Sequence, residues 1–373
     1  MERLLTTASS NKNNADPLNS TNSSLGVIPG LILNEQFVLH ANYAFASIYA
    51  LIFTVGMPGN ILMFLILLEG VRKPGAGLLS RTTAPVILNV VLADLGFLFY
   101  CVPVMFINTV WEDWRMGLAV CISHKGFFLW CIFVRFYSML TVSLLRYTAV
   151  IHPTYSQSLS HQLMVIICIL IWLLSLVVSI PYWMYATPVE LKGVASCQVL
   201  MTKEQTALYS RLLGGVAFFP ATLLMTLCYS NIIYVLWCRK TLIVPSESSL
   251  RANRKATIMI LATVMAFIVM WIPCWVLVFL AESMTLRPSP SVFLATNMTY
   301  FLAYTNCCVN PLIYFSLSDH FQAKLKIMLG CSGNGKERLK TSQSSGMRET
   351  FETVTSSLDA ENTSWSEGEA VNK

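Results

Sequence analysis

The sequence predicts an all-α membrane protein, a bundle of seven transmembrane helices followed by a short interfacial helix. Two observations support this fold class. Of the 373 residues, 55% are hydrophobic and only 12% are charged, which is more apolar than a soluble domain of this length needs. In addition, seven apolar stretches exceed the roughly 18–20 residues that cross the hydrocarbon core of a bilayer.

These stretches define the predicted organisation of the chain. In order, they lie near residues 43–68, 84–108, 119–150, 162–184, 207–237, 255–281 and 291–316. We therefore expect a polar tail over 1–40, the bundle over 41–316, an amphipathic interfacial helix over 317–331 and a disordered tail over 332–373. Because the loops between the spans are short, neighbouring helices should pack antiparallel.

Basic residues are distributed unevenly between the loops. They cluster after the first span, between the fifth and sixth spans, and after the seventh. Since a basic excess marks the cytoplasmic side, we expect a plasma-membrane protein with an extracellular N-terminus. The loop after the third span is an exception, with no Lys or Arg after Arg146. The net charge of +6 thus reflects topology and does not predict nucleic-acid binding.

Several positions outside the spans are candidates for covalent modification. Asn19 and Asn22 start glycosylation sequons in the polar leader, in which we expect no cleavable signal peptide. Cys121 starts the third span and Cys197 lies in the loop after the fourth, so both face the oxidising side and predict a disulfide. Cys331 follows the interfacial helix and is a palmitoylation candidate.

Two ionisable residues fall deep within the predicted spans. Asp94 lies fourteen residues from the outer end of span 2, and Arg135 lies fourteen residues from the outer end of span 3. At 1.5 Å per residue each is about 21 Å from that end, so the two charges share a depth. An unpaired charge there costs a few kcal/mol or more, which favours an intramembrane Asp94–Arg135 ion pair. The alternative is that Arg135 binds backbone carbonyls while Asp94 is protonated or hydrated.

Proline residues interrupt two spans. Pro311 breaks the hydrogen-bond ladder of span 7, and Asn310 and Tyr314, four residues apart, share a helix face from which they can satisfy the freed groups. Pro273 follows Trp271 in span 6. Pro311 is interpreted as a site of conformational change. A fixed kink is the alternative for both prolines, as is ordinary core packing for Trp271.

The chain resembles the rhodopsin-like (class A) G-protein-coupled receptors over residues 43–330. The similarity is carried by Gly59-Asn60, Leu88-Asn89-Val90-Val91-Leu92-Ala93-Asp94-Leu95, Trp114-Arg115-Met116-Gly117, Arg146-Tyr147, Trp172, Pro220, Trp271-Ile272-Pro273, and Asn306 with Asn310-Pro311-Leu312-Ile313-Tyr314. The resemblance implies an extracellular ligand and a cytoplasmic heterotrimeric G protein. It further implies that agonist binding near Trp271 moves span 6 about Pro273 and rearranges Arg146 and Tyr314.

Three departures from the family pattern alter these expectations. Leu145 stands where an acidic residue usually precedes Arg146, and Asn253 is neutral, which predicts raised basal activity. Arg135 replaces a small polar residue beside the usual sodium ion, so a tethered guanidinium predicts that no allosteric sodium site exists. Tyr229 follows Pro220 by nine residues rather than eight, a shift of about 100° that places its switch role in doubt.

The expected ligand class depends on two residue types that are absent from the sequence and on the resemblance of one segment to peptide receptors. Phe128 stands where amine receptors carry Asp, and Tyr304 where retinal proteins carry Lys. The segment 95–117 is most similar to peptide receptors of the galanin and allatostatin type, so we expect a peptide; a lipid or small metabolite is the alternative. The candidate pocket residues are Phe128, Trp271, Trp275, Glu282 and Tyr304.

The cytoplasmic tail suggests a regulatory role. Thr350, Thr353 and Ser356 repeat every three residues among acidic residues, so receptor kinases and arrestin are candidate partners. A merely solvated tail is the alternative.

Two other functions remain open at this stage. An atypical scavenger or arrestin-biased receptor is the main alternative, and a channel or transporter is disfavoured because the chain has no internal repeat. No catalytic, metal-ligating or cofactor-binding constellation is visible, so we expect no enzyme and no cofactor.

Overall fold

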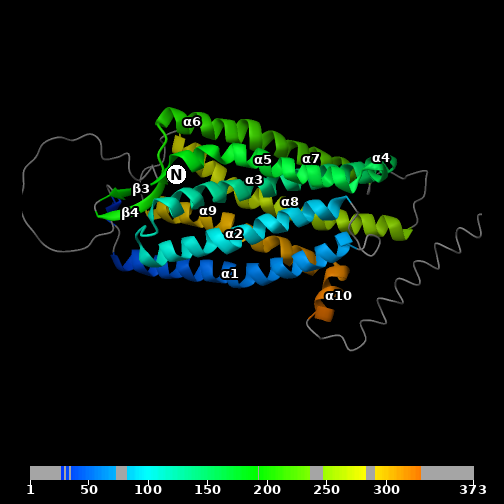
Figure 1. The fold of residues 1–373 in the computed structure, drawn as a ribbon, viewed down its shortest axis with the longest axis horizontal. Coiled ribbons are helices and arrows are strands. Elements are labelled where there is room, and N and C mark those ends of the chain that lie inside the picture. The colour runs from blue at the N-terminus through cyan, green and yellow to red at the C-terminus, as the bar shows by residue number, and fades with distance from the viewer. Residues whose placement is uncertain are drawn as a thin grey trace, which may run out of the picture. The chain divides into compact units, whose positions relative to one another are not determined.

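The computed structural model describes residues 27–28, 31–32, 35–72, 82–191, 193–235, 247–282 and 290–328. Seven long helical rods dominate this part of the chain (Figure 1). They are α1 (Glu35–Arg72), α2 (Thr83–Trp111), α3 (Gly117–Ile151), α5 (His161–Tyr185), the continuous run α6 (Lys203–Leu212), η3 (Leu213–Phe218) and α7 (Phe219–Ile233), α8 (Glu247–Glu282), and α9 (Pro290–Leu317).

Each predicted span corresponds to one rod, but several rods are longer than the span. Six rods in the described part of the chain have the length and hydropathy needed to cross a membrane, and α9, 28 residues long, is the seventh. α1 begins at Glu35, inside the predicted polar tail, and α8 begins at Glu247, eight residues before the predicted residue 255. Hydropathy marks only the part that suits hydrocarbon, whereas backbone hydrogen bonding continues into polar turns.

α2 packs against α3, and α3 is the rod with the most neighbours. α1 packs against α2 and α9, and α8 packs against α9. α3 contacts α2, α5, α7 and α8, which explains why it carries many of the buried side chains (Figure 1). A charged or polar side chain on α3 therefore meets several neighbouring helices at once.

Local signals explain where two rods begin. The Ser160 hydroxyl accepts a hydrogen bond from the Leu163 amide and caps α5. Thr202 and Gln205 form a reciprocal capping box at the start of α6. The Gln205 amide donates to the Thr202 hydroxyl at 3.1 Å, and the Thr202 amide donates to Oε1 of Gln205 at 2.9 Å. Both caps satisfy amides that the first helical turn leaves without partners.

Short elements that the sequence did not predict join the rods. Strands β3 (Ala186–Leu191) and β4 (Val194–Val199) form an antiparallel hairpin after α5, and Gly193 turns it with φ of 82°. A two-residue strand pair, β1 (Val27–Ile28) and β2 (Leu31–Ile32), precedes α1. α4 (Pro153–Ser158) follows α3.

Helix α10 (Asp319–Met328) belongs to a second compact unit that begins at Asp319. It is three residues shorter at its C-terminal end than the predicted interfacial helix. Cys331 and the three phosphorylation candidates lie outside the described residues, as do the sequon residues Asn19 and Asn22.

Candidate functional site

The predicted disulfide ties the hairpin to the start of α3. Cys121 and Cys197 are bonded, with 5.5 Å between their Cα atoms, and both are buried. Around them pack Val104, Trp114 and Ala186. The hairpin is thereby held at the end of the bundle where α2 ends and α3 begins.

A second connection joins the α2–α3 loop to the same hairpin. Oδ1 of Asp113 accepts a 2.7 Å hydrogen bond from the Ala195 amide, and the Trp114 amide donates to the Ala195 carbonyl at 2.9 Å. Arg115 forms an ion pair with Asp113 at 3.1 Å. The Ala195 hydrogen bond, followed by the Arg115 hydrogen bond, lowers the pKa of Asp113 below its ordinary 3.8.

The structure brings the two predicted intramembrane charges together. Nη1 of Arg135 lies 3.0 Å from Oδ1 of Asp94, and both side chains are fully buried. The second carboxylate oxygen, Oδ2, accepts a 2.7 Å hydrogen bond from Nδ2 of Asn310. Asp94 thus joins α2, α3 and α9 at one point.

Phe97 provides a further contact to the guanidinium, which sequence reasoning missed. Cζ of Arg135 lies 4.9 Å from the centre of the Phe97 ring. Phe97 follows Asp94 by three residues in α2, so both side chains leave the same helix face. The three-residue spacing of Asp94 and Phe97 was the sequence signal that could have predicted this contact.

A polar cluster beside the ion pair was also missed. Nδ2 of Asn89 donates to the Ser138 hydroxyl at 2.9 Å, while its Oδ1 accepts a 2.8 Å bond from the Trp172 indole. The indole of Trp130 donates to the Trp172 carbonyl at 2.9 Å. Polar residues within one or two turns of Asp94 and Arg135 were the signal for this α2–α3–α5 connection.

The candidate pocket residues fall into two aromatic groups. Phe128 and Tyr304, whose ring centres are 5.4 Å apart, belong to a group with Tyr49 and Phe97 between α1, α2, α3 and α9. The Tyr304 hydroxyl lies 3.3 Å from Nε2 of the buried His124, another residue that sequence reasoning missed. These four rings, Tyr49, Phe97, Phe128 and Tyr304, are called the outer aromatic cluster below.

The two tryptophans of α8 belong to the second group. Trp271 packs against Phe267, with 5.9 Å between ring centres, and Trp275 packs against Phe218 at 4.9 Å. Phe218 in turn stacks on Phe136 of α3 at 5.0 Å. The group links α3, η3 and α8 around Pro273. Glu282 ends α8, and its side chain lies outside the described residues.

Near the C-terminal end of α3, Arg146 is buried without an acidic partner among the described residues. Only 4% of Arg146 is exposed, and its Nε and Nη2 atoms have no hydrogen-bond partner there. Its electrostatic neighbours are the hydroxyls of Tyr229 and Tyr314. The adjacent Tyr147 is half-buried and its ring contacts that of His152.

Tyr229 faces the core in spite of its unusual spacing from Pro220. Tyr229 is buried, and its hydroxyl lies 3.4 Å from that of Ser143. Ala221, Met225 and Tyr229 share the inward face of α7, whereas Pro220 is exposed. Tyr229 is also an electrostatic neighbour of Arg146.

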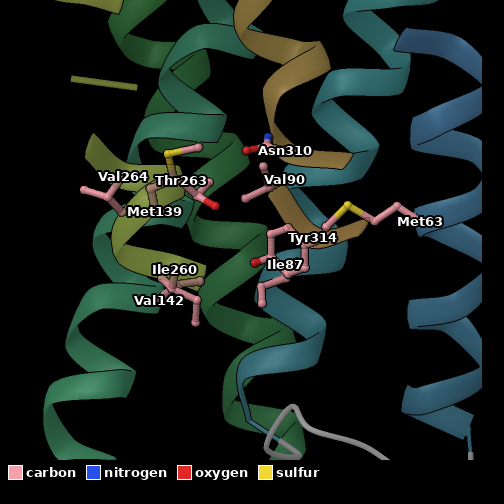
Figure 2. A pocket seen from close by; sticks show the side chains of 10 residues that line it. All are labelled: Met63, Ile87, Val90, Met139, Val142, Ile260, Thr263, Val264, Asn310 and Tyr314. Atoms are coloured by element: carbon pink, nitrogen blue, oxygen red, sulfur yellow. The ribbon is translucent and has the colours of Figure 1, made fainter. Parts of the chain in front are cut away.

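A small cavity is lined by Asn310, which bonds to Asp94, and by Tyr314, an electrostatic neighbour of Arg146. Its volume of about 20 Å³ admits one water molecule. Figure 2 shows the side chains of Asn310 and Tyr314 from α9 together with Thr263 and apolar side chains from α1, α2, α3 and α8. The two polar residues that flank Pro311 therefore meet the same internal space.

These features describe a membrane-embedded seven-helix bundle with polar connections across its core, and comparison with known proteins identifies its family. Residues 59–314 match the model of the "7 transmembrane receptor (rhodopsin family)". The chain belongs to this family, which is one of receptors and not of enzymes, and it is a multi-pass membrane protein. The resemblance and the predicted seven-transmembrane fold are confirmed.

The relatives include peptide receptors. The chain is 28% identical to galanin receptor type 2 of Mus musculus over 74% of this chain and 72% of the relative. It is 28% identical to the allatostatin-A receptor of Bombyx mori over 74% of this chain and 77% of the relative. It is 26% identical to galanin receptor 2a of Danio rerio over 76% of this chain and 77% of the relative.

Proposed function

We propose that this protein is a plasma-membrane receptor that binds an extracellular peptide and activates a heterotrimeric G protein. The observation that carries the proposal is the similarity to galanin and allatostatin-A receptors, which extends over about three quarters of this chain. The names of these relatives give galanin and allatostatin-A as their ligands. A similarity that includes most of both chains supports a shared mode of action as well as a shared fold.

The arrangement of side chains suits such a receptor. Phe128 and Trp275 are partly exposed and supply aromatic contact area, which is typical of peptide recognition, whereas Tyr49, Phe97 and Tyr304 are buried. Trp271 and Pro273 lie inward of Trp275 on α8, where a ligand-induced shift would change the direction of the helix. Arg146, which no described carboxylate holds, is the candidate contact for the G protein.

The direct test applies synthetic galanin and allatostatin-A peptides to cells that express the full chain. G-protein subunit dissociation and arrestin recruitment are measured in parallel, at surface levels matched with an N-terminal epitope tag. Arg146→Ala is the control variant, expected to reach the surface and bind peptide without G-protein dissociation. If neither peptide causes G-protein dissociation or arrestin recruitment in cells that carry the receptor on their surface, the result argues against a receptor for peptides of this kind.

The alternative is an atypical receptor that scavenges ligand or recruits arrestin alone, and Leu145 beside Arg146 is the observation in its favour. Arrestin recruitment without dissociation of any G protein is the result that selects it. Raised dissociation in the absence of peptide instead selects a constitutively active receptor.

Orientation and modification complete the proposal. If the N-terminus is extracellular, the epitope tag should be labelled on intact cells. If Asn19 and Asn22 are glycosylated, glycosidase treatment should lower the mass of the chain. Mass spectrometry after stimulation tests for palmitoylation at Cys331 and for receptor-kinase phosphorylation at Thr350, Thr353 and Ser356.

A further inference from the structure

We propose that Phe97 is a positioning residue that couples the other rings of the outer aromatic cluster to the Asp94–Arg135 ion pair. The guanidinium of Arg135 is fully buried, yet its Nε and Nη2 atoms have no hydrogen-bond partner among the described residues. Of the guanidinium nitrogens, only Nη1 donates to Asp94 among the described contacts. The buried cation therefore needs a further source of stabilisation.

The Phe97 ring supplies it. The face of an aromatic ring is negative and attracts a cation, and the attraction is larger when the cation is desolvated. Cζ of Arg135 lies 4.9 Å from the ring centre, within the range of this interaction. Because Asp94 and Phe97 are one turn apart on α2, they hold the guanidinium between a carboxylate and a ring.

The same ring is in contact with two of the residues that the sequence predicts to bind ligand. The Tyr304 ring centre is 5.0 Å from that of Phe97, and the Phe128 ring centre is 5.6 Å away. Tyr304 is in turn positioned by His124, 3.3 Å from its hydroxyl. A displacement of Tyr304 or Phe128 therefore moves Phe97, and with it the position that Arg135 prefers.

Arg135 carries the displacement to the proline of α9. Asp94, its partner, also holds Nδ2 of Asn310 at 2.7 Å, directly before Pro311. A shift of the guanidinium changes how Asp94 divides its charge between Arg135 and Asn310. This role of Phe97 in signalling depends on the proposed receptor function, whereas the interaction itself does not.

The test replaces Phe97 with phenylalanines that carry one, two or three fluorine atoms. Fluorine withdraws electrons from the ring face while the shape of the ring hardly changes, so the series weakens the attraction to the cation in steps. The purified full-length protein is measured without peptide or G protein. Thermal unfolding gives the stability of the bundle, and deuterium exchange of residues 306–315 reports on α9 around Pro311.

The proposal predicts an unfolding temperature that falls stepwise, by about 2–4 °C over the series, and α9 exchange that rises in the same order. In the neutral double variant Asp94→Asn/Arg135→Gln, the same series should change neither reading. Fluorination of Phe301, whose ring contacts Phe45 and Tyr49, is the second control and should also give no graded effect.

Three results would overturn the proposed role of Phe97. A constant unfolding temperature shows that the ring does not stabilise the cation. A falling temperature with unchanged α9 exchange shows that Phe97 is only structural, and an equal gradient at Phe301 shows that fluorine acts by general destabilisation. Because no ligand is used, these readings stand even if the peptide assay fails.

Discussion

Asn310 and Asp94 lie 2.7 Å apart, so the amide that precedes the α9 proline is held by the carboxylate that also pairs with Arg135. This relationship places one ion pair at the junction of α2, α3 and α9. A seven-helix bundle normally accommodates few such charges, because each one costs free energy in lipid. Here their mutual contact offsets that cost and connects three helices.

Removing one partner of this pair should destabilise the bundle. Arg135→Gln leaves a buried carboxylate without its cation, and we expect a loss of about 3–5 kcal/mol in the free energy of unfolding together with reduced surface expression. The charge exchange Asp94→Arg/Arg135→Asp should keep more surface expression than either single charge reversal. Surface labelling and thermal unfolding measure both effects, and equal tolerance of every single change would contradict the pairing.

Sodium should not modulate agonist affinity in this receptor. The Arg135 guanidinium already occupies the neighbourhood of Asp94, so a second cation would meet a neutralised carboxylate and a like charge. Agonist competition curves in sodium chloride and in an equal concentration of N-methylglucamine chloride should coincide. Arg135→Ser, which frees the carboxylate, is the variant expected to separate the two curves, and a separation in the unmodified protein refutes the prediction.

Gly126→Ala should destabilise the packing of α3 on α5. A Cβ atom at this position would meet the Trp183 ring at 2.2 Å, so the Trp183 side chain or the two helices must move. Overpacking of this kind costs about 1–3 kcal/mol in the free energy of unfolding. Gly215→Ala is the matched control, because nothing lies within 4 Å of a Cβ there. Similar unfolding temperatures for both variants would contradict the close contact.

Leu145→Asp should lower the basal activity. The new carboxylate would stand beside Arg146, whose Nε and Nη2 atoms have no partner among the described residues, and would hold the guanidinium in the resting position. Asn has nearly the same shape as Asp but carries no charge, so Leu145→Asn is the control. Basal G-protein dissociation at equal surface levels is the measurement, and a decrease of equal size in both variants would show that charge is not the cause.

The contact between Asp113 and Ala195 should make the hairpin sensitive to acid. The folded pKa of Asp113 lies below its ordinary 3.8, so its contribution to stability is complete at neutral pH and is lost as the pH falls through the folded value. The unfolding temperature of Asp113→Asn should therefore differ from that of the unmodified protein at pH 7 and approach it below about pH 4. A difference that does not depend on pH would argue against the ionised contact.

The positions of the spans could be predicted from the sequence because lipid imposes a simple rule. A helix in hydrocarbon must be apolar along about 20 residues, and that rule is visible residue by residue. For the same reason, Asp94 and Arg135 stood out as exceptions at matching depth. Helix ends were less accurate, since α1 and α8 continue into polar turns that hydropathy does not mark.

The hairpin, the cation–π contact of Phe97 and the inward position of Tyr229 could not be predicted in this way. β3 and β4 have no lipid constraint, and their pairing depends on contacts with the α2–α3 loop and on the disulfide. The rotation of α7 is set by which residues pack on α3, so Tyr229 faces inward in spite of the spacing from Pro220.

The sequence by itself determined the seven-helix class, the family resemblance and the two residues whose charges must be neutralised in the membrane, because burial in lipid penalises individual residues. Only the tertiary structure decided which third and fourth side chains, Asn310 and Phe97, share that neutralisation. These partners come from the packing angle and rotation of separate helices, which depend on many contacts at once.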